Sequence, residues 1–90
     1  MTRRVVVYTK PGCHLCEDAL ALLRELRAEF SLTIEEINIE RDPGLHKKYF
    51  DQIPVLVIDN RQTLAAPIRV EDVRDALMAE QPSRGTEMQR

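Results

Sequence analysis

The feature that most constrains the fold is a short loop near the start of the chain, where the spacing of apolar residues changes from that of a strand to that of a helix. Arg4 to Tyr8 is a β-branched run that favours a strand, and it ends at the turn formers Thr9-Lys10-Pro11-Gly12. A helix of about four turns follows from near Cys13, with Glu17 and Asp18 suited to the positive end of its dipole. Its apolar positions, at helical spacing, are Ala19, Leu20, Leu22, Leu23, Leu26 and Phe30.

The middle of the chain predicts an edge strand and a short helix. Leu32 to Ile39 is rich in Ile and Thr, but its alternation slips between Ile34 and Ile37, so we expect an edge strand with an uncertain register or a bulge. Asp42-Pro43 starts a short helix, because an Asp side chain caps helices and Pro is tolerated at the first helical position. The apolar residues of this helix that we expect to face inward are Leu45, Tyr49 and Phe50.

The last part of the chain predicts a hairpin and a final helix. Pro54 to Ile58 is apolar on both faces, as a central strand must be, and Asp59-Asn60 turns the chain into a strand from Thr63 to Ala66. The final helix fades at Gln81-Pro82, and residues 81–90, which hold little to bury, are expected to be disordered. The residues expected on the buried side of this helix are Val70, Val73, Ala76 and Leu77.

Together these elements predict one α/β domain over residues 1–80. A chain of 90 residues supports a single core, and a hydrophobic fraction of 43% is enough for a packed domain. The element order is β-α-β-α-β-β-α, in which the first β-α-β unit should be parallel with a right-handed crossover. The hairpin adds antiparallel strands, so we expect a mixed four-stranded sheet.

The charge of the chain argues against nucleic acid or a membrane surface as its partner. Its 13 basic and 15 acidic residues create no overall field that attracts a polyanion or an anionic bilayer. The longest early apolar run, Val5-Val6-Val7, is too short for a signal peptide or a membrane span. We therefore expect a cytoplasmic protein, and in that reducing compartment a purely structural disulfide is disfavoured.

The two cysteines are spaced for redox chemistry. Cys13 and Cys16 lie three positions apart, which on a helix places them one turn apart and close enough to form a disulfide. At a helix N-terminus, unpaired amides and the macrodipole stabilise a thiolate, and a cysteine pKa can fall from about 8.5 to roughly 3.5–7.5. We therefore expect Cys13 to be partly ionised at neutral pH, with Lys10 adding a secondary favourable charge.

The two sulfurs are expected to differ in role. Cys16 falls within the apolar stripe of the helix, whereas Cys13 sits at the helix start beside that stripe. Cys13 is therefore the expected nucleophile toward a substrate disulfide, and Cys16 the buried thiol that resolves the mixed disulfide. Cysteines at this spacing also occur as small buried hydrophobes, but their position beside a strand-helix-strand pattern favours a thioredoxin-like redox motif.

At these residues the chain resembles the glutaredoxins, and it looks most like small glutaredoxin-like bacterial proteins with a Cys-His-Leu-Cys site. The matching segments are Tyr8 to Cys16, Asp42-Pro43 and Ile53-Pro54-Val55. The resemblance implies a three-layer thioredoxin-like fold and a thiol-disulfide oxidoreductase that reduces protein or glutathione disulfides and is reset by glutathione or a reductase. It also implies a cis peptide bond before Pro54, opposite the dithiol, with Ile53 offering backbone hydrogen bonds to an extended substrate.

Near the cysteines the chain departs from the family pattern. His14-Leu15 stands where glutaredoxins usually have Pro-Tyr, which changes the environment of both sulfurs. A protonated His14 would stabilise the Cys13 thiolate, although a helix N-terminus disfavours the imidazolium. Val7 stands where thioredoxins have a buried acid, so the sequence offers no evident proton acceptor for Cys16.

The glutathione site implied by the resemblance is incomplete. Glutaredoxins carry a Gly-Gly followed by Asp ahead of the last helix, whereas Ala65 to Asp72 contains no Gly-Gly that would form a nest of amides for a carboxylate. Lys10 and Asp72 remain the candidates for binding the charged ends of glutathione. We expect no tightly bound cofactor, glutathione as the candidate cosubstrate, and a monomeric protein.

Two functions of other classes stay open at this point. A metal or iron-sulfur site would use the thiolates, with His14 and His46 as further ligands, but this set is poor for a closed four-ligand zinc site. A noncatalytic interaction domain would keep the fold, although it would gain nothing from a reactive dithiol. The carboxylates of Glu35-Glu36 and Glu71-Asp72 are interpreted as solvated, without catalytic geometry.

Overall fold

The computed structural model describes residues 2–79 and contains the predicted elements in the predicted order. The strands are β1 (Arg3–Thr9), β2 (Leu32–Asn38), β3 (Val55–Ile58) and β4 (Gln62–Ala65). The helices are α1 (His14–Leu26), α2 (Pro43–Tyr49) and α3 (Val70–Ala79), and a 3-10 turn, η1 (Ile39–Arg41), precedes α2. The predicted domain end at residue 80 and the expected disordered tail, residues 81–90, lie outside the described residues and stay predictions.

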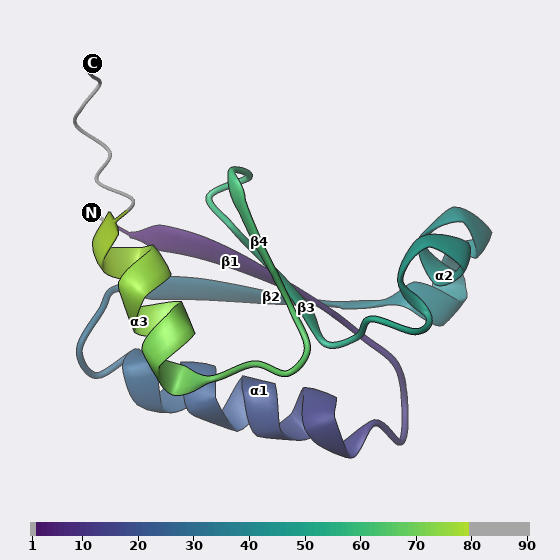
Figure 1. Cartoon of the computed structure of the whole chain (residues 1–90), viewed down its shortest axis with the longest axis horizontal. Coiled ribbons are helices and arrows are strands. Elements are labelled where there is room, and N and C mark those ends of the chain that lie inside the picture. The colour runs from purple at the N-terminus through teal and green to yellow at the C-terminus, as the bar shows by residue number, and fades with distance from the viewer. Residues whose placement is uncertain (1, 80–90) are drawn as a thin grey trace.

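The strands form one mixed sheet in the order β2-β1-β3-β4. β1 and β2 are parallel, whereas β3 pairs antiparallel with both β1 and β4. In Figure 1 helices α1 and α3 lie on one side of the sheet, and α2 lies beyond the end where β2 finishes. Helix α1 is the crossover that the parallel pair requires, and the predicted mixed α/β fold is confirmed.

The core lies between the sheet and helices α1 and α3. Its buried side chains are Val5, Val7, Leu20, Leu23, Leu26, Leu32, Leu56, Ile58, Val73, Ala76 and Leu77. Strand β3 is apolar on both faces, as predicted for a central strand, with Val55 and Leu56 both fully buried. Burial of aliphatic surface, at about 25 cal/mol per Å², is the main force that holds α1 against the sheet and so fixes the position of its N-terminus.

Helix α2 contacts the opposite face of the sheet at one end. Successive residues of a strand point to opposite faces, so Tyr8 faces away from the core, and its ring stacks on that of Tyr49 with centroids 4.8 Å apart. The predicted cap is present, because Asp42 Oδ1 accepts hydrogen bonds from the amides of Gly44 and Leu45 at 2.8 and 3.3 Å. Helix α2 thus forms the third layer, over one end of this face.

Phe50 does not face inward, and that prediction is wrong. Its side chain is 54% exposed, because α2 ends at Tyr49 and Phe50 falls just past the side of the helix that meets the sheet. The ring instead stacks on His46 at the surface, with centroids 5.9 Å apart. The side of a seven-residue helix that faces the sheet is too short for three large side chains to pack there.

The edge strand β2 has a regular register, so the expected bulge is absent. It lies at the sheet edge, as predicted, and all of its residues pair in sequence with those of β1. Ile34 packs against the core, while Ile37 is half-buried on the other face beside α2. The alternation of apolar and polar residues is interrupted because both Glu35 and Glu36 contact solvent, one on each face of this edge strand.

Two apolar residues near helix ends differ from the prediction. Val70 is 43% exposed because it is the first residue of α3, whose other predicted core residues are buried. Phe30 follows α1 rather than extending it, since the helix ends at Leu26. The Phe30 N–H donates to the Leu26 carbonyl at 2.8 Å, and the ring packs half-buried against the core.

The turn between β3 and β4 is tied to β1 and α3 through Asp59. Asp59 and Asn60 have positive φ values of 53° and 59°, the geometry of a tight hairpin turn that these residues tolerate. Asp59 Oδ1 accepts a hydrogen bond from the Arg4 N–H at 2.9 Å, and Oδ2 accepts one from Arg3 Nε. Arg3 Nη1 also donates to the Leu77 carbonyl of α3. Burial raises the pKa of Asp59, but the bonds from Arg4 and Arg3 outweigh burial and hold this pKa below its ordinary value.

We expect Asp59→Asn to lower the free energy of unfolding at pH 7 by about 1 to 3 kcal/mol, because Arg3 loses the carboxylate that pairs its charge. Folding lowers the pKa of Asp59, so this contribution is present above the unfolded carboxyl pKa of about 3.9 and is lost as pH falls through the lower folded value. Urea unfolding across this pH range should show that the unfolding free energies of wild type and Asp59→Asn converge at acid pH. The exposed Asp51→Asn is the control and should stay within about 0.5 kcal/mol of wild type; equal stability of all three proteins at pH 7 would contradict the assignment.

Candidate functional site

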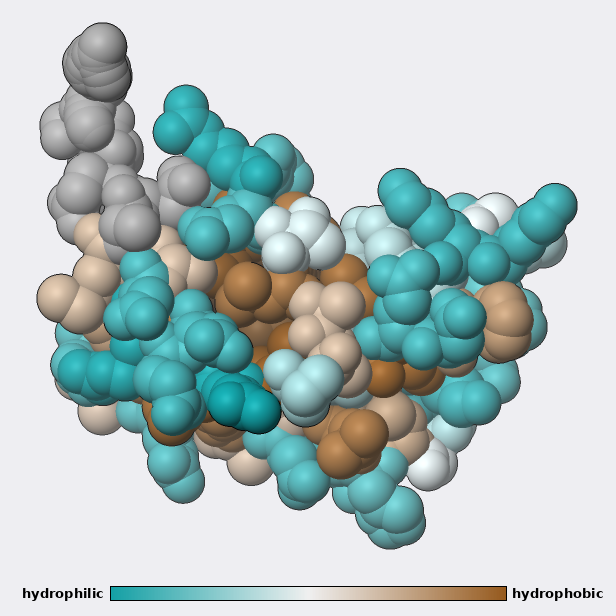
Figure 2. Space-filling model, in the orientation of Figure 1, coloured by the Kyte–Doolittle hydropathy of each residue, from teal (hydrophilic) through white to brown (hydrophobic). Residues whose placement is uncertain are grey.

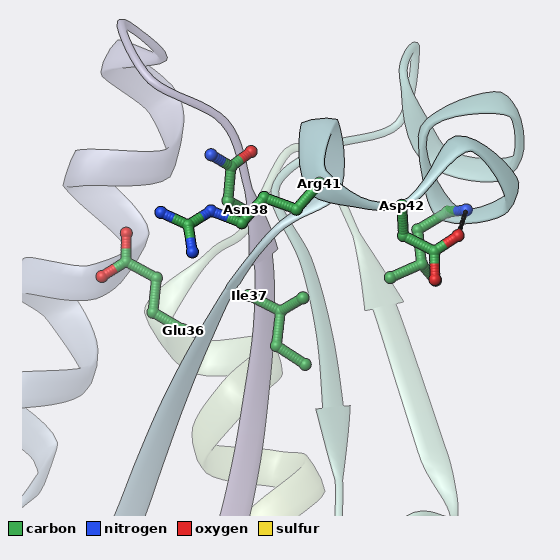
Figure 3. A pocket seen from close by; sticks show the side chains of 6 residues that line it. Glu36, Ile37, Asn38, Arg41 and Asp42 are labelled. Carbon is green, nitrogen blue, oxygen red and sulfur yellow. Dashed lines mark hydrogen bonds between the residues drawn. The ribbon is translucent and has the colours of Figure 1, made fainter.

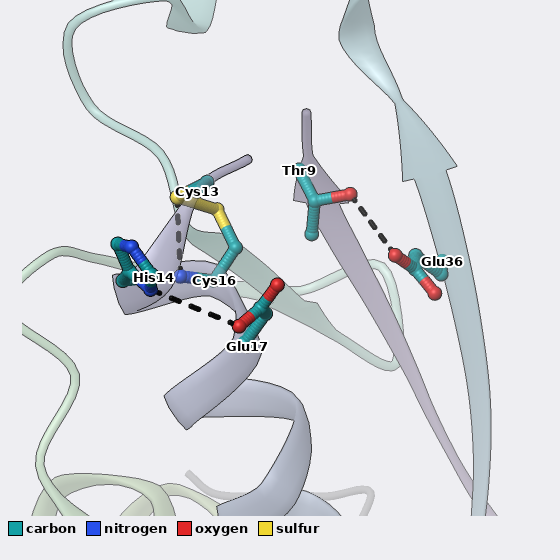
Figure 4. Close-up of a disulfide and its surroundings, with 6 residues drawn as sticks. All are labelled: Thr9, Cys13, His14, Cys16, Glu17 and Glu36. Carbon is teal, nitrogen blue, oxygen red and sulfur yellow. Dashed lines mark hydrogen bonds and ion pairs between the residues drawn. A yellow bond between two sulfur atoms is a disulfide. The ribbon is translucent and has the colours of Figure 1, made fainter. Parts of the chain in front are cut away.

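The two cysteines meet at the N-terminus of α1, where a disulfide joins them (Figure 4). Cys13 is the N-cap residue, with extended backbone angles (φ -92°, ψ 106°), and its Sγ accepts a hydrogen bond from the Cys16 N–H at 3.1 Å. The two Cα atoms are 5.2 Å apart. Cys16 is 2% exposed, whereas Cys13 is half-buried. The expected difference in accessibility between the two sulfurs is therefore present.

The loop before α1 sets the position of Cys13. Gly12 has a φ of 78°, a left-handed conformation that costs glycine little, and it turns the chain from β1 into α1. An N-cap side chain usually accepts a hydrogen bond from the N2 or N3 amide through an oxygen, and here the sulfur of Cys13 takes that place. A thiolate accepts the same bond with a full charge, which strengthens it. This geometry favours the ionised form of Cys13.

A cavity of about 170 Å³ lies beside the disulfide. Both cysteines line it, together with Lys10 and the paired side chains of Thr9 and Glu36. The buried Thr9 Oγ1 donates to Glu36 Oε2 at 3.3 Å, and Figure 4 shows this pair on the two strands that face the first turn of α1. Glu17 of that turn lines the same cavity. Two carboxylates therefore share a cavity with the sulfurs.

Glu36 is a candidate functional residue that the sequence prediction missed, because it treated Glu35-Glu36 as a solvated pair. Glu36 is exposed, as predicted, but it also lines the dithiol cavity. Glu35 instead pairs with Arg4 at 2.9 Å on the other face of the sheet. The register of β1 and β2, which sets Glu36 opposite Val7, is the signal that would have revealed the difference.

The charges around the sulfurs oppose one another. The helix N-terminus and Lys10 favour a thiolate, while the carboxylates of Glu17 and Glu36 disfavour it. The His14 side chain is 95% exposed, and its Nδ1 lies 3.9 Å from Glu17 Oε1. A positive charge on His14 would therefore be partly neutralised by Glu17, which weakens the support that the sequence suggested for the Cys13 thiolate.

Pro54, which Ile53 precedes, lies on the other side of the first turns of α1. The peptide bond between them is cis, as the family resemblance implied, and so is the Ala66-Pro67 bond. Pro54 is buried and lines an apolar groove together with Leu15. The Ile53 N–H donates to the Tyr49 carbonyl at 3.1 Å, so the Ile53 carbonyl is the group that remains as a candidate for backbone pairing with a substrate.

The two residues expected to hold the charged ends of glutathione belong to different segments: Lys10 follows β1, and Asp72 is part of α3. Lys10 lines the dithiol cavity. Asp72 is exposed in the first turn of α3 and lines neither that cavity nor the apolar groove. Their roles in binding stay predictions.

A larger hollow of about 510 Å³ adjoins the dithiol cavity but contains neither cysteine. It lies where β2 ends and α2 begins, and Figure 3 shows Arg41 reaching back over the end of β2 toward Asn38 and Glu36. Glu36 and Asn38 line both hollows. The mixed charges of Arg41, Asp42 and Glu36 give this hollow a polar lining beside the redox site.

Residues 2–79 contain neither a cluster of metal ligands nor a helix that could span a membrane. No group of three or more His, Cys, Asp or Glu side chains within this range is placed to hold a metal ion. His46, one of the two histidines considered for a metal site, lies on α2 and stacks on Phe50. None of the helices in the same range combines the length and the apolar character needed to cross a membrane.

The chain is similar to a known protein family and to several solved structures. The family model described as Glutaredoxin-like domain (DUF836) matches residues 4–78. Protein Ne2328 from Nitrosomonas europaea, solved by NMR, is 38% identical, with a TM-score of 0.71 over 83% of this chain and 89% of that chain. A mutant thioredoxin from Halobacterium salinarum NRC-1 is 13% identical, with a TM-score of 0.69 over 86% of this chain and 73% of that chain, a likeness of fold alone.

A curated relative is also similar. The uncharacterized protein Rv0508 of Mycobacterium tuberculosis is 28% identical over 64 residues, which are 66% of this chain and 66% of that protein. The match therefore spans slightly less than two thirds of the relative.

We expect Glu36→Gln to make Cys13 of the reduced protein about twofold more reactive toward iodoacetamide at mildly acidic pH. Removal of a carboxylate stabilises the thiolate, and the effect across a solvated cavity is small because even unit charges about 4 Å apart in water interact by only about 1 kcal/mol. Alkylation rates followed by intact mass measure the effect. Glu35→Gln is the matched control, because Glu35 pairs with Arg4 on the other face. Equal rates for the two variants would show that Glu36 does not act on the sulfur.

Proposed function

This chain belongs to the Glutaredoxin-like domain (DUF836) family over residues 4–78, and from that premise we propose that it is a thiol-disulfide oxidoreductase. It exchanges the Cys13–Cys16 pair with protein or glutathione disulfides and works as a reductant in the cytoplasm. The observation that supports the proposal best is the N-cap position of Cys13, whose sulfur accepts the Cys16 N–H at 3.1 Å. This is an environment that stabilises a thiolate, the reactive form in disulfide exchange.

The exchange takes place in two displacement steps. The Cys13 thiolate attacks one sulfur of the substrate disulfide, a bond forms between these two atoms, and the other substrate sulfur leaves as a thiolate. Cys16 then gives up its proton and attacks Cys13 Sγ, and the second substrate sulfur leaves with the electron pair. The substrate disulfide is reduced by two electrons, and the two cysteines are oxidised to the disulfide present in the structure.

The burial of the two sulfurs supports this division of labour. Cys16 is 2% exposed, so an incoming disulfide reaches the half-buried Cys13 first. Once the mixed disulfide has formed, Cys16 is held within one helical turn of it, and an intramolecular attack from this distance outcompetes thiols in solution. The mixed disulfide with wild-type protein is therefore short-lived.

Regeneration of the dithiol requires a second reductant. We propose glutathione or a reductase in this role, with no tightly bound cofactor in the protein itself. Lys10 is the charged side chain beside the sulfurs that would meet a carboxylate of glutathione, since it lines the cavity that both cysteines line. Glutathione in this proposal is a cosubstrate that enters and leaves during each cycle.

The proposal predicts three distinct products in glutathione redox buffers followed by intact-mass spectrometry. Wild-type protein should equilibrate between the dithiol and the internal disulfide, with only a transient glutathione adduct. Cys16→Ser should accumulate the adduct on Cys13, because the resolving thiol is gone. Cys13→Ser, the matched control, should form neither the adduct nor the disulfide at a comparable rate, because its remaining sulfur is buried.

The same titration can overturn the proposal. An internal disulfide that fails to form at any glutathione ratio would rule out dithiol exchange. Metal analysis of protein purified without air would then decide between a thiolate metal site and a noncatalytic domain. Adducts that form equally on Cys13→Ser and Cys16→Ser would contradict the assignment of Cys13 as the nucleophile.

A further inference from the structure

The resolving step of the proposed exchange needs a proton acceptor for Cys16, and the sequence offered no evident one. Cys16 is still a reduced thiol while a substrate is bonded to Cys13, and it must lose its proton to attack, because the thiolate is the nucleophile. Cys16 is 2% exposed, so bases in solution have little access to it. The acceptor therefore has to be a group of the protein that shares a cavity with Cys16.

The polar surroundings of Cys16 lie on one side of α1. On the other side the apolar groove is lined by Leu15 and Pro54 but not by Cys16, and in Figure 2 apolar side chains gather in the middle of the visible face, over α1 and the β4–α3 loop. On the dithiol side, Cys16 lines the cavity of about 170 Å³ together with Glu17 and Glu36. Within residues 2–79, these two carboxylates are therefore the candidates for accepting the proton.

Of the two carboxylates, Glu36 is held in place by a neighbouring strand, whereas Glu17 is turned to solvent. Glu36 Oε2 accepts a hydrogen bond from the buried Thr9 Oγ1 at 3.3 Å, on the strands that face the first turn of α1 (Figure 4). The Glu17 side chain is 71% exposed, and its Oε1 lies 3.9 Å from Nδ1 of the exposed His14. The geometry therefore favours Glu36 as the acceptor.

Water in the cavity provides a path for the proton from Cys16 to Glu36. A cavity of about 170 Å³ has room for several water molecules, since each takes up about 30 Å³. Such waters find polar partners in Lys10, Asn38 and the two carboxylates, which all line the cavity. Glu36 is also exposed, so a proton taken from the buried thiol passes on to the solvent.

A carboxylate that accepts the proton also gives up its own charge. An ionised Glu36 disfavours a second negative charge in the cavity, but a protonated Glu36 is neutral when the Cys16 thiolate has formed. The other charged groups around this site are Glu17 and Lys10 in the cavity and Arg41 of the adjoining hollow, which reaches toward Glu36 (Figure 3). The transfer therefore moves a negative charge from Glu36 to Cys16 without adding one.

We infer that Glu36 accepts the Cys16 proton, through water, in the step that resolves the mixed disulfide, and that Thr9 is a positioning residue for Glu36. The Cys16 S–H bond breaks, its electron pair forms the bond to Cys13 Sγ, and the substrate sulfur leaves as a thiolate. The proton passes to Glu36 and from there to the solvent. This inference rests on the proposed exchange function, because Glu36 acts here only on a dithiol that reacts with a substrate.

The test separates the two displacement steps with dithiodipyridine, an uncharged aromatic disulfide. Attack by Cys13 of the reduced protein releases a first thiopyridone at a rate that rises with reagent concentration, and attack by Cys16 releases a second at a rate that does not. Stopped-flow absorbance records both. At neutral pH Glu36→Gln should slow the second release at least about tenfold, since general base catalysis contributes about 10²–10⁴. The first release should not be slowed.

Further variants locate the effect and distinguish proton transfer from a structural role. Glu35→Gln, the matched control on the other face of the sheet, and Glu17→Gln should not slow the second release. Thr9→Val, which loses the hydroxyl that holds Glu36, should slow it about threefold. Formate in solution should speed the second release of Glu36→Ala but not of wild type. The deficit of Glu36→Gln should shrink above about pH 8.5, where a thiol ionises without an acceptor.

The outcomes separate the inference from the proposed function. A second release that Glu36→Gln leaves unchanged, or that Glu17→Gln slows as much, would overturn the role of Glu36 while exchange itself stands. A deficit that neither formate nor high pH reduces would overturn proton transfer as its cause. Release of no second thiopyridone from wild-type protein would overturn the proposed function, and the inference with it.

Discussion

The site depends on the backbone N–H groups that remain unpaired at the first turn of a helix. Every α-helix leaves such donors at its start, and in this chain the loop that ends at Gly12 delivers a sulfur to them in the place of a capping oxygen. The Cys16 N–H points at Cys13 Sγ, so the first turn is complete only when that sulfur accepts a bond. A thiolate satisfies the donor better than a thiol, which links helix formation directly to reactivity.

The packing of α1 makes the two sulfurs unequal. The same apolar stripe that holds the helix on the sheet, through Leu20 and Leu23, continues to Cys16 and buries it. Cys13 lies one turn earlier, at the cap, where the helix leaves the sheet. The unequal burial on which the proposed roles of nucleophile and resolving thiol rest therefore follows from where the apolar stripe ends. The Asp59 network at the opposite end of β1 supports this by fixing the strand on which the helix rests.

Most helices and strands could be predicted from residues that are neighbours in the sequence. The predictions that were wrong or missing concerned residues whose positions depend on contacts between elements. Asp42 could be assigned as a cap, and Cys16 as buried, because each depends on residues within one helical turn. Phe50 was misplaced because its exposure depends on where α2 meets the sheet. Glu36 was missed because its face depends on the register of β2 against β1, and an edge strand with polar residues on both faces carries little information about register.

Helix α1 has a polar cavity on one side and an apolar groove on the other. At 100° per residue, the positions of Cys16 and Leu20 face the dithiol cavity, while those of Leu15 and Ala19 face the apolar groove. The cavity can act only on the reduced protein, because the disulfide is neutral and a thiolate is not. The carboxylates that line the cavity raise the free energy of the thiolate form, and this favours donation of its electrons. In the proposed exchange, Glu17 and Glu36 would therefore make the dithiol a stronger reductant, while the helix N-terminus and Lys10 act in the opposite sense.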